Sequence, residues 1–194
     1  MSTPALSTPL AKAALDDRFS RPLWLATLAV LGTIAITISA RINVPMWPVP
    51  MTMQTFAILV IAMAYGARLG GATVALYLAE GAAGLPVFAG GGGLAYMAGP
   101  TGGYLAGFLV SAIVVGLLAE RGWSRNWALT LIAMTIGTAI IFVFGVGYLA
   151  TLIGAREAVA AGFTPFIWGS VFKIALGAAV MPLAWSLVGA RAGR

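Results

Sequence analysis

The sequence predicts an all-α integral membrane protein, and three observations carry that prediction. Hydrophobic residues make up 61% of the 194 residues, charged residues make up only 8%, and the mean hydropathy is +1.00. A soluble domain carries roughly 25% charged residues because its surface faces water. The apolar residues also form continuous runs, without the roughly ten-residue alternation of a membrane β-barrel. A helical bundle embedded in lipid is the fold class that remains.

The apolar runs divide the chain into six candidate membrane-spanning helices, since about 20 apolar residues cross the hydrocarbon core. We predict six transmembrane helices at residues 23–40, 52–67, 69–84, 102–119, 127–149 and 166–189. Only the segment from Gly66 to Gly70 separates the second from the third, so these two should form a tight antiparallel hairpin. The predicted organisation is a cytoplasmic tail at 1–22, a membrane domain at 23–190 and a second cytoplasmic tail at 191–194.

The distribution of Lys and Arg predicts that both ends of the chain are cytoplasmic, because cytoplasmic loops carry an excess of these residues. Six crossings place eight basic residues on the side of the termini: Lys12, Arg18, Arg21, Arg68, Arg121, Arg125, Arg191 and Arg194. Arg41 and Arg156 fall on the opposite side. These residues form no basic stripe, so the net charge of +6 indicates membrane topology and not a nucleic-acid partner. We therefore expect a multi-pass protein in contact with lipid in the cell membrane, the inner membrane in bacteria.

The residue types that are missing argue against catalysis. The chain has no Cys and no His, and its five acidic residues are scattered along the sequence. General acid–base catalysis needs titratable groups placed together. We therefore predict no enzyme activity, no metal and no cofactor. A membrane-embedded enzyme and a purely structural assembly subunit remain as alternatives from other functional classes.

Lys173 is the sharpest functional signal in the sequence. It lies about two turns inside the run 166–189. The free energy of placing an ammonium group at such a position in a membrane helix is at least about 2.5–3.5 kcal/mol unfavourable. It shares one helical face with Phe166, Ser170 and Gly177. This placement predicts that Lys173 faces a cavity holding a ligand carboxylate or polar ring. The alternative is that its long side chain reaches the membrane interface.

Other candidate residues lie near the predicted external side, where the segments 41–50, 85–101 and 150–164 are expected to be long loops. Glu80 should need a partner, such as Lys173, Arg41 or a ligand donor, and a structural ion pair is equally open. Gln54 can donate hydrogen bonds to an amide-like or urea-like group and accept them from it. The alternative is that Gln54 only caps backbone groups. Phe88, Tyr96 and Trp168 form either an interfacial aromatic belt or the walls of a pocket.

Two further features concern partners. The glycine run at 90–93 lacks the Gly-Lys-Ser/Thr ending of a nucleotide-binding loop. We therefore predict that this run does not bind a nucleotide. Small residues in the run 23–40 allow another helix to approach closely, either inside the bundle or on a partner subunit.

Three motifs resemble those of the BioY family, the biotin-specific substrate-binding (S) components of energy-coupling factor transporters. They are Val49-Pro-Met-Thr-Met-Gln-Thr55, Tyr77-Leu-Ala-Glu-Gly-Ala-Ala-Gly-Leu-Pro-Val-Phe-Ala-Gly-Gly91 and Gly99-Pro-Thr-Gly-Gly-Tyr104. The resemblance covers nearly the whole chain after the tail. It implies the six-helix S-component fold and capture of biotin from outside. It also implies two partners, a transmembrane coupling (T) protein and a cytoplasmic ABC ATPase. The alternative is an S component for another small vitamin or precursor.

The resemblance also implies site residues. Gln54 and Lys173 match polar residues of the family's biotin site, whereas Ser170 stands where the family pattern Gly-Asp-x-x-Lys has a carboxylate, for which Glu80 is a candidate substitute. The predicted substrate-binding set is Lys173, Ser170, Gln54, Glu80, Tyr96, Trp168 and Phe88. An Ala-x-x-x-Ala contact for the T protein has its nearest matches at Ala29, Thr33, Ala35 and Ser39.

Overall fold

The computed structural model describes residues 21–192, and most of them are helical. The elements in chain order are α2 (Arg21–Arg41), β1 (Asn43–Val44), β2 (Met51–Thr52), α3 (Gln54–Ala82), α4 (Leu94–Met97), α5 (Gly102–Glu120), η1 (Trp123–Arg125), α6 (Trp127–Ile153), α7 (Ala155–Gly162), η2 (Thr164–Phe166) and α8 (Ile167–Ala192). Residues 1–20 and 193–194, which hold most of the predicted tails, lie outside the described residues. The helix bounds agree closely with four of the predicted runs, 23–40, 102–119, 127–149 and 166–189.

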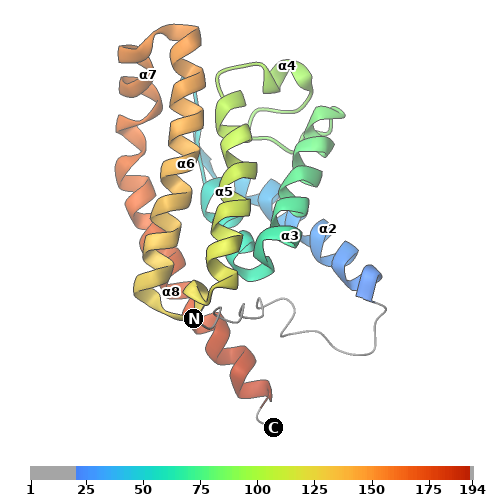
Figure 1. Cartoon of the computed structure of the whole chain (residues 1–194). Helices are drawn as coiled ribbons and strands as arrows, with labels where there is room; N and C mark the ends of the chain where they lie inside the picture. Colours follow the sequence, from blue (N-terminus) through green and yellow to red (C-terminus); the bar gives the residue numbers. More distant parts are fainter. Residues whose placement is uncertain (1–20, 193–194) are drawn as a thin grey trace, which may run out of the picture.

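α3 contains the predicted hairpin as two helical legs that fold back on one another (Figure 1). The break is at Gly66, whose φ of 79° and ψ of 177° leave the helical region. Gln54 and Tyr77 are hydrogen-bonded at 2.6 Å, although a continuous helix would separate them by about 34 Å. The turn is tighter than predicted, because the second leg resumes directly after Gly66 and not after Gly70. A residue with a side chain rarely adopts this positive φ, so glycine makes the reversal possible.

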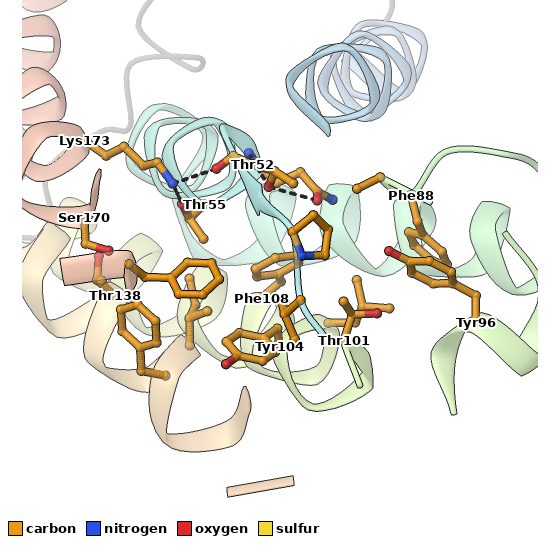
Figure 2. A pocket seen from close by; sticks show the side chains of 18 residues that line it. Thr52, Thr55, Phe88, Tyr96, Thr101, Tyr104, Phe108, Thr138, Ser170 and Lys173 are labelled. Atoms are coloured by element: carbon orange, nitrogen blue, oxygen red, sulfur yellow. Dashed lines mark hydrogen bonds between the residues drawn. The ribbon is translucent and has the colours of Figure 1, made fainter. Parts of the chain in front are cut away.

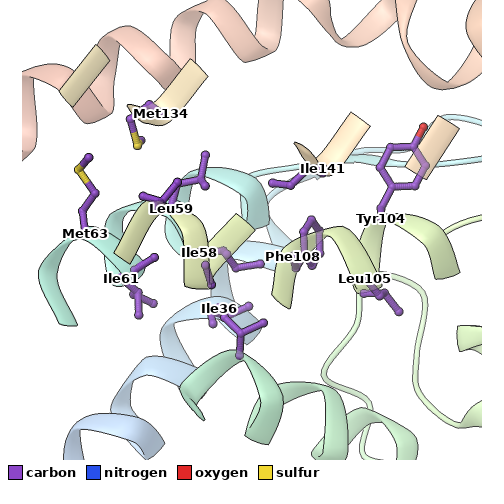
Figure 3. Close-up of a cluster of buried hydrophobic side chains, with 14 of the residues drawn as sticks. Ile36, Ile58, Leu59, Ile61, Met63, Tyr104, Leu105, Phe108, Met134 and Ile141 are labelled. Atoms are coloured by element: carbon purple, nitrogen blue, oxygen red, sulfur yellow. The ribbon is translucent and has the colours of Figure 1, made fainter. Parts of the chain in front are cut away.

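The helices pack around one apolar core, with α5 between α3 and α6 (Figure 1). Ile36 from α2, Ile58 and Leu59 from α3, and Met134 from α6 are fully or almost fully buried there (Figure 3). Lipid tails are as apolar as these side chains, so close packing rather than escape from water holds such helices together. α8 lies against α6 and contacts α3, and its Gly169 lies beside Met51 of β2.

The bundle has two unlike ends. One carries the turn of α3 and η1, and the other carries the β1–β2 ribbon, α4 and α7 (Figure 1). β1 and β2 pair antiparallel, with Asn43 opposite Thr52. The expectation of a long loop at 150–164 is wrong, because α6 continues to Ile153 and α7 fills most of the remainder. Gly154, with a φ of 90°, ends α6, and the Ala residues that follow favour a new helix, so α7 forms although Arg156 and Glu157 are polar.

Five helices within residues 21–192 are long and apolar enough to cross a membrane. They are Pro22–Arg41, Gln54–Ala82, Gly102–Glu120, Trp127–Ile153 and Ala155–Ser186. The second of these is the folded-back α3, which the sequence had predicted as two crossings. Large apolar side chains such as Ile34, Ile38, Val143 and Phe172 are exposed on the outside of the bundle. A hydrocarbon environment accepts such a surface, whereas water does not.

We predict that Gly103 is required for the contact between α5 and α6. A Cβ atom at Gly103 would overlap the carbonyl oxygen of Phe144 and the Cβ of Tyr148. Because backbone cannot yield as a flexible side chain does, Gly103→Ala should lower the free energy of unfolding by about 1–3 kcal/mol. Thermal unfolding of the purified protein in detergent measures this effect.

Gly147→Ala is the matched control, because a Cβ atom at Gly147 meets nothing within 4 Å. That substitution should leave the melting temperature unchanged or raise it slightly, since alanine favours a helix over glycine. Equal melting temperatures for the two variants would contradict the packing described here.

Candidate ligand-binding site

A cavity opens near the end of the bundle that carries the ribbon and α4. Its volume is about 50 Å³. Small-molecule sites typically measure about 300–1,000 Å³. The cavity is therefore narrower than such a site, because the side chains that line it stand close together. The lining residues are Val49, Pro50, Thr52, Gln54, Thr55, Phe88, Ala89, Tyr96, Thr101, Tyr104, Leu105, Phe108, Thr138, Ile141, Phe142, Phe166, Ser170 and Lys173.

Lys173 forms the polar end of this cavity, together with the residues that begin α3. Its Nζ donates to the Thr52 carbonyl oxygen at 2.6 Å and to Thr55 Oγ1 at 3.1 Å (Figure 2). The side chain is 9% exposed, so it does not extend to the membrane interface as the alternative required. Ser170 lies one helical turn earlier on α8 and lines the same cavity. Among the residues that the structure describes, no carboxylate lines the cavity, so its charge is positive.

Gln54 is buried at the first residue of α3 and is held by two side chains. Its Nε2 donates to the Tyr77 hydroxyl at 2.6 Å, and its Oε1 accepts from Thr52 Oγ1 at 3.1 Å. Thr52 Oγ1 also accepts from the Gln54 backbone N–H at 3.2 Å. An amide offers two N–H donors and two acceptor positions, so Gln54 keeps one of each for a ligand.

The opposite end of the cavity is aromatic and belongs to the segment 85–101. Phe88 is fully buried and stacks on Tyr96, with ring centroids 5.3 Å apart. In Figure 2 these two rings lie far from Lys173, with Tyr104 and Phe108 between. Backbone bonds close this segment over the cavity, including Phe88 N–H to the Gly91 carbonyl at 2.9 Å and Gly93 N–H to the Gly81 carbonyl at 2.7 Å. The arrangement suits an elongated molecule with an apolar body and polar groups.

The structure therefore brings together Lys173, Ser170, Gln54, Tyr96 and Phe88 of the seven predicted site residues. Glu80 does not line the cavity; its Oε1 accepts from Thr33 Oγ1 of α2 at 3.1 Å. Lys173, one of the three partners left open for Glu80, bonds instead to Thr52 and Thr55, because helix geometry turns Glu80 toward α2. Trp168 is 82% exposed on the outer surface of α8, which fits the aromatic belt and not the pocket wall. We remove both residues from the candidate site.

The four predicted docking residues of α2 do not share one face. Thr33 and Ser39 are buried in the bundle, and the Ser39 hydroxyl donates to the Ile36 carbonyl at 2.6 Å. Ala29 is half-buried and Ala35 is exposed. A helix turns by about 100° per residue, so two overlapping small-residue patterns cannot both face outward. Thr33 and Ser39 serve internal packing, and only Ala35 and part of Ala29 remain open to a partner.

Several lining residues were missed by sequence reasoning. Thr52 and Thr55 flank Gln54 within one short motif, and that proximity was a usable signal. Tyr104 and Phe108 lie four residues apart on α5 and so share a face, but their helix is apolar on all sides. Tyr77 touches Gln54 only because α3 folds back, so no local pattern reveals it.

The sequence of this chain is similar to those of several known proteins. The BioY family model matches residues 12–190. The "Biotin transporter BioY" of Thermotoga maritima is 41% identical over 154 residues, covering 78% of this chain and 90% of the relative. The protein of the same name from Rhizobium etli is 37% identical over 186 residues, covering 89% of this chain and 99% of the relative.

A solved structure shares the fold. It is the 2.1 Å crystal structure of the S-component for biotin from an ECF-type ABC transporter. The TM-score is 0.77 at 24% sequence identity, with 89% of this chain and 95% of the other covered. This chain therefore has the helical arrangement of that structure. On the family match and the two relatives, this chain is a member of the BioY family of multi-pass membrane proteins.

Proposed function

We propose that this protein captures biotin from outside the cell and delivers it for uptake as an S component. The observation that carries the proposal is the cavity of the BioY-type bundle, with the Lys173 ammonium at one end and the Phe88–Tyr96 pair at the other. The curated relatives are named biotin transporters, which supports the same substrate. The BioY family is a transporter family and not an enzyme family.

The chemistry of biotin fits the lining residues. Biotin has a ureido group with one carbonyl and two N–H groups, an apolar sulfur-containing ring and chain, and a carboxylate. In the proposed complex, the Lys173 ammonium contacts a polar end of biotin, while Gln54 and Ser170 hydrogen-bond to the ring. Phe108, Ile141 and the Phe88–Tyr96 pair pack against the apolar body. A charge-assisted hydrogen bond in a low-dielectric cavity contributes more than a neutral one.

The narrow cavity requires that side chains or the covering segment move when biotin enters. The cover at residues 85–93 is tied to the helices by few hydrogen bonds, among them Gly93 N–H to the Gly81 carbonyl and the Tyr77 hydroxyl to the Val87 carbonyl, so it can open when these bonds break. We propose that the segment opens to admit biotin and closes again over it.

The proposed topology has six crossings with both termini in the cytoplasm, counting the two legs of α3 separately. Its support is that the α3 turn with Arg68 and the η1 region with Arg121 and Arg125 lie at one end of the bundle (Figure 1). Arg41 and Arg156 lie near the opposite end, as the positive-inside rule requires of an external face. Each leg is shorter than the hydrocarbon core of about 30 Å, which buried neighbours make tolerable.

The proposed partners are a T protein in the membrane and a cytoplasmic ABC ATPase, as an S component of an energy-coupling factor transporter needs. The chain itself has no nucleotide-binding loop of the Gly-Lys-Ser/Thr type. The exposed outer face of α2, which includes Ala35, is the docking surface we propose for the T protein.

We predict that Lys173→Met weakens equilibrium binding of tritiated biotin to the purified protein by roughly 10–100-fold. This range corresponds to the loss of a hydrogen bond to a charged group, about 1.5–3 kcal/mol. Trp168→Leu is the control on the same helix and should leave the affinity unchanged. Equal affinities for wild type and Lys173→Met would exclude Lys173 from the site. If another vitamin displaced biotin at lower concentration, the S component would serve that vitamin instead.

We also predict that accumulation of tritiated biotin in cells rises when the T protein and the ABC ATPase are expressed with this chain. The matched control carries an ATPase that cannot hydrolyse ATP. Uptake that is the same with and without active partners would contradict the proposed partnership while leaving biotin binding intact.

A further inference from the structure

Tyr77 connects the two ends of the cavity although it does not line it. The residue lies in the second leg of α3 and is fully buried. Its hydroxyl accepts from Gln54 Nε2 at 2.6 Å and donates to the Val87 carbonyl oxygen at 2.9 Å. One buried side chain therefore bonds both to a polar group of the site and to the segment that covers it.

The direction of these hydrogen bonds fixes the orientation of the Gln54 amide. A tyrosine hydroxyl has a single proton, and Tyr77 gives it to the Val87 carbonyl. Its oxygen can then only accept, so the NH₂ side of the Gln54 amide has to face Tyr77 and the carbonyl side has to face Thr52. A ligand at the cavity thus meets Gln54 in one amide orientation and not in two.

The ring of Tyr77 supports the cover in a second way. It meets the Phe88 ring edge to face at 5.4 Å between centroids, and Phe88 in turn stacks on Tyr96. Edge-to-face pairs of this kind contribute stability beyond their buried area. Arg41 adds a separate anchor from α2, because its guanidinium donates to the Pro86 carbonyl. Loss of the Tyr77 hydroxyl should therefore loosen the cover without releasing it fully.

We propose that Tyr77 is a positioning residue that orients Gln54 and holds the cover at residues 85–93 closed over the cavity. Residues 85–93 can move only by breaking the Tyr77–Val87 bond, and the same bond determines which face Gln54 presents. Ligand recognition at Gln54 and closure of residues 85–93 are therefore coupled through one hydroxyl. The identity of the ligand in this inference rests on the proposed function, whereas the coupling itself does not.

The test compares Tyr77→Phe with Tyr65→Phe, both of which remove only a hydroxyl from α3. Tyr65 is a matched control, because its hydroxyl also donates to a backbone carbonyl, that of Leu28 at 3.1 Å, but away from the cavity. Tyr77→Phe should raise the dissociation rate of bound biotin roughly tenfold, equivalent to about 1.4 kcal/mol. Tyr65→Phe should leave that rate unchanged. Equal dissociation rates for the two variants would overturn the inference, whatever their melting temperatures.

Hydrogen exchange in the protein without ligand separates this inference from the proposed function. The backbone amides of residues 85–93 should exchange faster in Tyr77→Phe than in Tyr65→Phe, and those of α5 should not differ. If wild type binds no biotin, the proposed function fails while this comparison still decides the role of Tyr77. Equal exchange at residues 85–93 in both variants overturns that role.

Gln54→Met tests the same coupling at the other hydrogen bond of Tyr77. It replaces Tyr77→Phe as the test variant if Tyr77→Phe does not fold. It removes the donor to Tyr77 from a residue that makes no bond to the cover. Because hydrogen bonds that are connected in series polarise one another, the hydrogen exchange of the amides of residues 85–93 should be faster in this variant too. The effects of Gln54→Met and Tyr77→Phe should not add in the double variant, and full additivity would contradict the coupling.

Discussion

The hydrogen bonds of the Lys173 ammonium across α8 and α3 are the constraint on which the site depends. A charge inside a membrane helix is tolerated only where protein or ligand groups replace its water. Here the carbonyl of Thr52, the last residue of β2, and Oγ1 of Thr55, in the first turn of α3, take that place. The carbonyl is free to accept because the chain enters α3 from the β1–β2 ribbon and not from a preceding helical turn. The ribbon, the helix start and the buried cation therefore form one unit.

The folded-back α3 provides the second requirement of the site. It places Gln54 beside Tyr77, and Tyr77 reaches the segment that follows α3. The cavity is thus built largely from residues 49–108, while α6 and α8 contribute its far wall and its charge. In the proposed transporter, the helices hold the polar groups in place and the cover supplies the movement. The groups that recognise the ligand can therefore stay fixed while the cover moves to admit it.

Much of the architecture was predictable because a membrane restricts the possible structures to a few. The bounds of α2, α5, α6 and α8 followed from apolar run length, and the inward direction of Lys173 followed from the high free energy of a charge in lipid. The short helix α7, which contains Arg156, was missed, because polar residues do not by themselves prevent a helix. Glu80 and Trp168 were included in the predicted site although neither lines the cavity. A helix that is apolar on all sides gives no periodic pattern to show which of its faces points inward. The reversal near Gly66 was predicted, but the Gln54–Tyr77 pair depends on the register of the two legs of α3, which residue types alone do not specify.

A crystal structure of the purified protein grown with biotin tests the central claim most directly. The account predicts one biotin molecule inside the cavity, with a polar end within hydrogen-bond distance of Lys173 Nζ, its ring hydrogen-bonded to Gln54 and Ser170, and its apolar body against Phe108 and the Phe88–Tyr96 pair. Biotin bound on another surface of the protein, or an empty cavity at saturating biotin, would contradict it.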